Sequence, residues 1–122
     1  MTAIKPRITV DYADKAIIIT FADEKILEEK DIEAIQQALI SVIEQSERIN
    51  LVLDFCNVRF LSSAVLGLLI RISKKVYERD GQLRLCNINP KIYEIFKITR
   101  LTRIFEIYRD AEDAVEGLAA LE

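Results

Sequence analysis

Hydrophobic residues recur along this chain at two spacings, and each spacing predicts one kind of secondary structure. Residues 8–10 and 16–21 are short runs of β-branched and aromatic side chains separated by charged residues, which predicts two strands joined by a tight turn. From Asp31 to about residue 47, apolar side chains recur at the spacing of one face of an amphipathic helix. The chain is therefore expected to open with a hairpin followed by a helix.

The middle of the chain predicts a buried strand and a second helix. Residues 51–55 form a nearly continuous apolar run, which is typical of a strand covered on both faces in a parallel sheet. A long apolar segment from Ser63 to about Arg79 predicts a helix. Asp80 and Gly81 follow it, and turn chemistry at these two residues is expected to end the helix.

The last third of the chain repeats the alternation of strand and helix. Residues 83–86 predict a buried strand, and Asn89 and Pro90 supply the cap and first position of a helix. A short strand at residues 104–108 precedes a final helix at residues 110–121. The order ββαβαβαβα predicts an α/β fold in which a mixed β-sheet is flanked by helices.

The composition fits one domain that spans residues 1–122. Of the 122 residues, 51% are hydrophobic and 30% are charged, with three glycines and two prolines, so no disordered segment or linker is indicated. The net charge of -3, with both signs interleaved, disfavours a nucleic-acid partner. No stretch approaches the roughly 18 apolar residues of a membrane span, so we expect no membrane contact and a cytoplasmic location.

Cysteine and histidine usage excludes several kinds of chemistry. Cys56 and Cys86 do not form a CxxC motif and both lie in apolar runs, so we expect buried thiols and no metal site. Histidine is absent, which removes the usual general base and metal ligand. Without a histidine or an SxxK lysine to activate Ser63, we expect a protein that is not an enzyme and has no cofactor.

Two adjacent serines, Ser62 and Ser63, lie where a strand gives way to a helix, and two interpretations are open. One serine could cap the helix by accepting from its free N–H groups. Alternatively, a serine here is a phosphorylation switch, because a helix N-terminus stabilises added negative charge. A phosphate at this position would leave the domain folded and would act on a docked partner instead.

The helix after the serines is apolar over a wider arc than one sheet requires. Leu66, Ile70 and Tyr77 fall beside the main stripe on a helical wheel, where they form either an exposed ridge for a partner or a surface that a neighbouring helix covers. Gly67 faces outward and lowers helix propensity, which suggests a close approach by a partner or by another helix. The main stripe, which should cover the sheet, consists of Val65, Leu69, Ile72 and Val76.

Two charged segments receive no function from the sequence. Residues 23–31 are mostly acidic, which is typical of a solvated stretch before a helix. Residues 98–103 contain two arginines that could meet a phosphate or a partner, although cations are common at helix ends.

Four segments together resemble the STAS domain of bacterial anti-sigma factor antagonists. The resemblance covers nearly the whole chain and implies a STAS-type mixed β-sheet flanked by helices. The segments are LVLDF at residues 51–55, VRFLSSAVLG at 58–67, GQLRLC at 81–86, and residues 92–105 with Phe96, Leu101 and Phe105.

In that family, the motif Asp-Ser-Ser/Thr-Gly-Leu-Gly carries a serine that is phosphorylated by a serine kinase, which is also the anti-sigma factor. The resemblance places Ser63 at this serine. At the other positions Ser62 replaces the aspartate, Ala64 the second hydroxyl residue and Val65 the first glycine, whereas Leu66 and Gly67 match.

The resemblance implies partner switching. The unmodified protein would bind a serine-kinase anti-sigma factor and so free a sigma factor, and phosphorylation at Ser63 would end this binding. ATP and magnesium would belong to the kinase. The partner-binding residues implied are Ser62, Ser63 and Ala64 in the recognised loop, with Leu66, Gly67 and Ile70 as a docking ridge.

An alternative within the same family is a STAS scaffold or sensor-complex subunit that regulates something other than a sigma factor. The changes around Ser63 favour this alternative, in which Ser63 is only a cap and the protein self-associates weakly. The sequence also leaves open whether Ser62 is the acceptor and whether a nucleotide binds.

Overall fold

The strands expected from the sequence form one mixed sheet in the computed structural model, which describes residues 7–13, 16–46 and 48–119. β1 (Ile8–Tyr12) runs antiparallel to β2 (Ile17–Phe21), as expected of the opening hairpin. β2, β4 (Asn50–Asp54), β6 (Gln82–Cys86) and β7 (Glu106–Tyr108) are parallel, and the strand order is β1-β2-β4-β6-β7. The mixed sheet is therefore confirmed.

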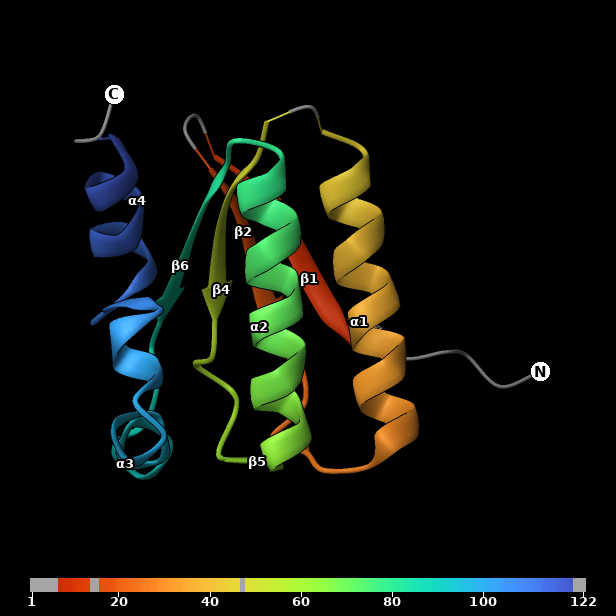
Figure 1. Ribbon diagram of the computed structural model, residues 1–122, viewed down its shortest axis with the longest axis vertical. Coiled ribbons are helices and arrows are strands. Elements are labelled where there is room, and N and C mark those ends of the chain that lie inside the picture. The colour runs from red at the N-terminus through yellow and green to blue at the C-terminus, as the bar shows by residue number, and fades with distance from the viewer. Residues whose placement is uncertain (1–6, 14–15, 47, 120–122) are drawn as a thin grey trace.

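Helices cover both faces of this sheet (Figure 1). α1 (Glu29–Glu44) and α2 (Ser63–Glu78) lie side by side on one face, and α4 (Ala111–Ala119) packs against β4 and β6 on the other. α3 (Pro90–Ile98) and the 3-10 helix η1 (Leu101–Arg103) connect β6 to β7. The sequence of elements confirms the expected α/β architecture.

The apolar run of β4 is explained by cores on both faces. Leu51 and Leu53 belong to the large core beneath α1 and α2, whereas Val52 belongs to a smaller cluster with Ala114 and Leu118 of α4. Alternate side chains of a strand point to opposite faces, so a central strand covered twice needs apolar residues at every position.

Two short strands were not expected from the sequence. β3 (Lys25–Ile26) and β5 (Phe60–Leu61) pair in parallel as a separate two-stranded sheet beside the main one. Two residues are too few for a periodic pattern, so nothing in the spacing could mark them. They flank α1 and α2 and therefore affect where both helices begin.

Element boundaries differ from expectation at two places. α1 begins two residues before Asp31, because the amides of Asp31 and Ile32 both donate to the carbonyl oxygen of Glu28 at 3.0 Å. β7 begins at Glu106, because the Phe105 amide donates to the Leu101 carbonyl at 3.0 Å and so continues the turn of η1. Residues 47 and 120–121, expected at helix ends, lie outside the described residues.

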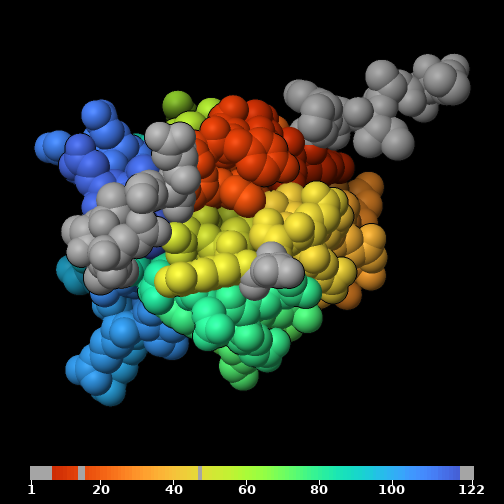
Figure 2. All heavy atoms as spheres, turned by 90° about the horizontal axis from the view of Figure 1, so that it is seen from above, coloured from red at the N-terminus to blue at the C-terminus, as the bar shows by residue number. Residues whose placement is uncertain are grey.

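The left-handed residue in the turn after α2 is Asp80 and not Gly81. Asp80 takes the left-handed conformation, with φ of 58°. Gly81 is required for another reason: an added Cβ would overlap the Ile49 carbonyl oxygen. The ends of α1 and α2 meet at this surface (Figure 2), where the Arg79 guanidinium donates to the Ser46 carbonyl oxygen at 2.6 Å.

The expectation of two buried thiols is right for Cys86 and wrong for Cys56, which is exposed. Cys56 follows the end of β4, where its amide donates to Asp54 Oδ1 at 2.9 Å and the chain leaves the sheet. Partial burial, with the nearby Asp54 carboxylate, raises the pKa of the Cys56 thiol. Burial raises the pKa of Cys86 to about 12.

We expect Gly81→Ala to lower the free energy of unfolding by about 1–3 kcal/mol, because the backbone around Ile49 must move to admit the methyl group. Gly67→Ala in α2 is the matched control. Its Cβ would meet only Arg71 Nη1 at 3.6 Å, so it should raise stability by about 0.5–1 kcal/mol. Urea unfolding of both variants measures this, and equal destabilisation would contradict it.

Iodoacetamide should label Cys56 alone in the native protein and both cysteines in urea. Because the pKa of Cys56 is raised, its labelling rate should keep increasing above the pH at which an ordinary thiol has ionised. Asp54→Asn keeps the hydrogen-bond acceptor while removing the charge, and should shift this rate profile to lower pH. An unchanged profile would contradict the assigned role of Asp54.

Candidate functional site

The start of α2 is held in place by backbone pairing. After β4 the chain turns outward, and the amides of Arg59 and Phe60 both donate to the Glu24 carbonyl oxygen, at 2.8 and 3.1 Å. The Ser62 amide donates to the Ile26 carbonyl at 3.0 Å. These bonds continue the β3–β5 pairing up to the residue before the helix, so the first turn of α2 is fixed to the rest of the domain.

Two asparagine side chains reinforce this loop. Asn57 Nδ2 donates to the Phe21 carbonyl oxygen at 3.0 Å. Asn89 Nδ2 donates to the Val58 carbonyl at 3.1 Å, while its Oδ1 caps α3 by accepting from the Ile92 amide at 2.9 Å. The cap expected at Asn89 is confirmed, and the same side chain ties α3 to the loop before α2.

The structure distinguishes the two serines clearly. Ser62 occupies the N-cap position of α2, but its Oγ is buried and hydrogen-bonds to nothing in the described chain. Ser63 is the first residue of the helix and is exposed. The expectation that a serine hydroxyl caps this helix is wrong, because the cap hydrogen bond comes from the backbone: Val65 N–H donates to the Ser62 carbonyl at 3.0 Å.

The electrostatics at Ser63 favour an added anion. Ser63 and Ala64 stand in the first turn, where backbone N–H groups have no acceptor within the helix. The first turn of α2 contains no acidic residue that already uses this positive end of the helix dipole. The N-terminal end of α2 would therefore stabilise a phosphate on the Ser63 hydroxyl.

A groove between α1 and α2 begins beside Ser63. On the α2 side it is lined by Ala64, Gly67 and Arg71, and Arg71 reaches across to donate to Gln36 Oε1 of α1 at 2.8 Å. Gly67 has only this guanidinium near its missing Cβ, so close packing within the domain does not explain the glycine. Glu29, Ile32 and Glu33 complete the lining.

The expected core stripe of α2 is confirmed, and one neighbouring residue was placed wrongly. Leu66 is only 7% exposed and belongs to the large core, so its side chain is not part of an outward ridge. Ile70 is partly buried against the same core, and Tyr77 is 45% exposed. α1 packs against α2 and covers much of the apolar surface that the sheet does not. This agrees with the interpretation that a neighbouring helix covers these residues.

Phe60, beside the serines, was missed by sequence reasoning. Its ring is 46% exposed, and the ammonium of Lys25 lies 5.6 Å from the ring centroid. With Arg59, Asn89 and Pro90 it borders a shallow hollow next to the start of α3. The only signal was an aromatic residue two positions before a serine pair, which does not by itself indicate exposure.

No helix in the described part of the chain is long and apolar enough to cross a bilayer. Within residues 7–13, 16–46 and 48–119, no group of three or more cysteine or carboxylate side chains is arranged to hold a metal ion.

Comparisons with known proteins agree on the domain. The sequence profile of the STAS domain matches residues 8–114. The candidate anti-sigma factor antagonist BtrV of Bordetella bronchiseptica is 26% identical over 90 residues, which cover 74% of this chain and 75% of BtrV.

Solved structures share the fold. An anti-sigma factor antagonist (STAS) domain protein from Planctomyces limnophilus superposes with a TM-score of 0.84 at 22% identity, covering 92% of this chain and 97% of that one. The Bacillus cell fate determinant SpoIIAA in its phosphorylated form gives a TM-score of 0.69 at 16% identity, covering 91% and 98%. With the profile spanning most of the chain, the conclusion is that this chain belongs to the STAS domain family.

Proposed function

We propose that this protein is an anti-sigma factor antagonist that acts by partner switching, with Ser63 as the switch. In the unmodified state it binds a serine-kinase anti-sigma factor, and phosphorylation at Ser63 releases it. The observation that carries this proposal is the contrast between Ser63, exposed at the first position of α2, and Ser62, whose hydroxyl oxygen is buried. A kinase can reach only the former without rearranging the loop.

The relatives support a regulator rather than an enzyme. BtrV is named for antagonism of an anti-sigma factor, and SpoIIAA has been solved in a phosphorylated form. Ser63 also lies at the position that the resemblance to the family assigns to the phosphorylated serine. The changes of neighbouring residues, such as Ser62 in place of aspartate, would then alter which kinase recognises the loop.

The proposed chemistry is a phosphoryl transfer that the kinase performs. The Ser63 Oγ attacks the γ-phosphorus of ATP bound with magnesium on the kinase, the new O–P bond forms, and the bond to the β,γ-bridging oxygen breaks to release ADP. The hydroxyl proton leaves to a base on the kinase. This domain contributes only an accessible acceptor on a rigid loop.

Release would follow from charge and bulk at the docking surface rather than from unfolding. A phosphate adds about -1.5 to -2 charges at pH 7, and the helix end tolerates it. The proposed docking surface consists of the exposed Ser63 and Ala64, together with Ser62, Gly67 and Ile70, which are less exposed. Gly67 would let a partner approach α2 closely, since the domain's own packing makes no use of its missing side chain.

Mass spectrometry of the protein from its own cells tests the switch. Trypsin should release residues 60–71, FLSSAVLGLLIR, in which Ser62 and Ser63 are the only hydroxyl residues. We expect one phosphate, and fragment ions that place it on Ser63. Ser63→Ala should abolish it, whereas Ser62→Ala should retain it. A phosphate on Ser62, or none under any growth condition, would overturn the proposal and favour the scaffold alternative.

The helix-end argument predicts the stability of charge variants at Ser63. Ser63→Asp should be as stable as the wild type or more stable by about 0.3–1 kcal/mol, because a negative charge opposes the positive end of the α2 dipole. Ser63→Lys is the matched control and should be destabilised by a similar amount. Thermal unfolding at low salt measures both, and a marked loss of stability in Ser63→Asp would contradict release without unfolding.

A further inference from the structure

Positive charge gathers at the end of α3, around the two arginines for which sequence analysis indicated no function. Between residues 91 and 104 the chain has four cations and one acid, a net charge of +3, although the whole chain carries -3. Large apolar side chains are exposed in the same place: Ile98 is 79% and Ile104 is 52% exposed. We call Lys97, Ile98, Arg100, Arg103 and Ile104 the basic corner.

Arg100 is held in a costly backbone conformation at this corner. Its φ of 63° and ψ of 20° are left-handed, which costs a non-glycine residue about 1 kcal/mol. Neither Arg100 nor Arg103 forms an ion pair with any residue that the structure describes, whereas Lys97 pairs with Glu94 at 3.3 Å. The Arg100 backbone joins α3 to η1, because its amide donates to the Lys97 carbonyl at 3.1 Å and its carbonyl accepts from the Arg103 amide at 3.2 Å. Its guanidinium has no such structural role among the described residues.

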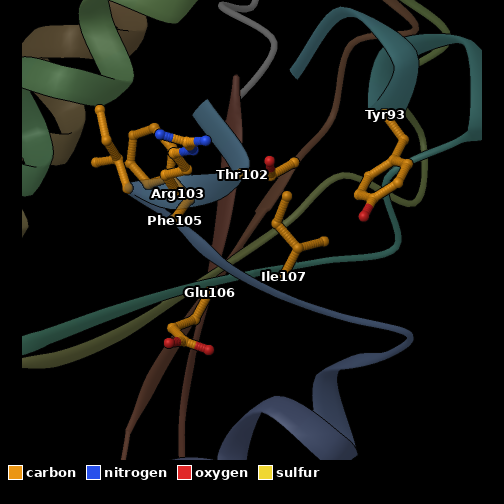
Figure 3. Close-up of a pocket in the computed structure, with 7 residues that line it drawn as sticks. Tyr93, Thr102, Arg103, Phe105, Glu106 and Ile107 are labelled. Atoms are coloured by element: carbon orange, nitrogen blue, oxygen red, sulfur yellow. The ribbon is translucent and has the colours of Figure 1, made fainter. Parts of the chain in front are cut away.

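A hollow lies beside the basic corner (Figure 3). Side chains from three elements line it: Tyr93 of α3, Thr102 and Arg103 of η1, and Glu106 and Ile107 of β7. β7 is the last strand of the sheet, so its outer side has no strand partner within the described chain. Exposed apolar side chains beside such a hollow are typical of a protein contact surface.

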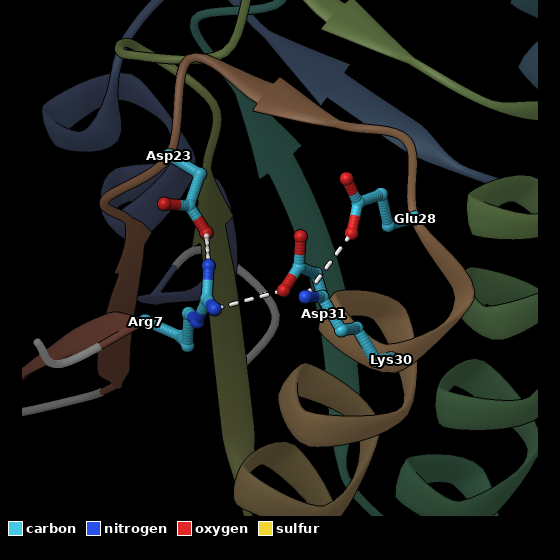
Figure 4. A network of polar contacts seen from close by, with 5 residues as sticks. All are labelled: Arg7, Asp23, Glu28, Lys30 and Asp31. Carbon is cyan, nitrogen blue, oxygen red and sulfur yellow. Dashed lines mark hydrogen bonds and ion pairs between the residues drawn. The ribbon is translucent and has the colours of Figure 1, made fainter. Parts of the chain in front are cut away.

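The complementary surface lies on the same molecule, at the start of α1. Residues 23–33 contain six acids and two lysines, a net charge of -4, around Leu27, which is 49% exposed. Arg7 neutralises part of it by bridging Asp23 at 3.0 Å and Asp31 at 2.8 Å (Figure 4).

The acids that remain differ in whether they already have a partner, and Glu24 pairs with Arg59 at 3.7 Å. Glu28 forms only an exposed pair with Lys30 at 3.4 Å, which contributes little. Glu29 and Glu33, one helical turn apart, form no ion pair with the described residues. We call Leu27, Glu28, Glu29 and Glu33 the acidic patch.

We propose that the basic corner binds the acidic patch of a second copy of this chain. Each surface has an exposed apolar residue at its centre and carries the opposite charge. Two charges on each form no ion pair with a described residue: Arg100 and Arg103 on one, Glu29 and Glu33 on the other. α3 and the start of α1 lie on opposite sides of the molecule in Figure 1, so one copy cannot join its own two surfaces. The contact joins different surfaces on the two copies, and it therefore extends head to tail into short chains.

Sedimentation velocity of the full protein over a concentration series tests this. At about 0.05 M NaCl the mass should rise with concentration above the 14.0 kDa monomer, and at about 0.5 M NaCl it should fall back towards the monomer. The double variant Arg100→Glu/Arg103→Glu should stay monomeric throughout. A wild type that is monomeric at every concentration at low salt would overturn the proposal, as would a double variant that associates like the wild type.

Variants with reversed charges test whether the two surfaces bind each other. The variant Glu28→Lys/Glu29→Lys should also be monomeric alone, because its patch and its corner are then both basic. Mixing it with Arg100→Glu/Arg103→Glu should restore association, because each surface of one variant then faces a surface of opposite charge on the other. Failure of the mixture to associate would overturn the proposed pairing. Binding of the monomeric wild type to anionic lipid vesicles, lost in Arg100→Glu/Arg103→Glu, would overturn it by assigning the corner to a membrane surface.

Matched glycine variants separate charge from backbone strain. Arg100→Gly should raise the thermal unfolding temperature and weaken association at least several-fold, because it relieves the left-handed strain while removing a charge. Asp80→Gly relieves the same strain (φ of 58°) in the turn after α2, far along the chain from either surface, and should leave association unchanged. Equal loss of association in both variants would contradict a local role of Arg100.

Discussion

The pairing of two short strands fixes the candidate site of this domain in place. Where β5 runs along β3, the Glu24 carbonyl oxygen accepts two amides and the Ile26 carbonyl accepts the amide of Ser62. These bonds set the direction in which the chain enters α2, and therefore which serine is outside and which is inside. Without them, only the side chains of Asn57 and Asn89 and a turn at Val58 would hold the segment between β4 and α2.

α2 can serve the core and the proposed docking surface together because different faces of the helix supply the two sets of residues. Val65, Leu66 and Leu69 belong to the large core. Ala64 and Gly67, which have small side chains or none, line the groove between α1 and α2. Core packing of this kind resists deformation, since interiors are packed at crystal-like density. The proposed switch therefore needs no movement of the helix: the surface changes its charge while the scaffold below stays the same.

The sequence was most informative where local residue type and spacing decide the structure. The alternating elements, the core stripe of α2 and the cap at Asn89 all followed from spacing and residue type. It failed where a tertiary contact decided the outcome. Cys56 lies in an apolar run yet is exposed because the chain leaves the sheet after Asp54.

The candidate site was likewise predictable in part. Its position at the start of α2 was predictable from the turn residues and the serine pair. The burial of Ser62 Oγ and of Leu66, and the exposure of Phe60, were not predictable, because they depend on β3, β5 and α1, which come from elsewhere in the chain. Two-residue strands have no sequence signature that could have revealed this pairing.

Asn89 links parts of the molecule that its position in the sequence does not connect. One side chain caps α3 through Oδ1 and holds the loop before α2 through Nδ2. If the loop opened, the amide group would lose the bond that orients it, and the cap of α3 would be held by Oδ1 alone. The loop and the first turn of α3 therefore form one cooperative unit, whose amide protons should exchange with solvent together.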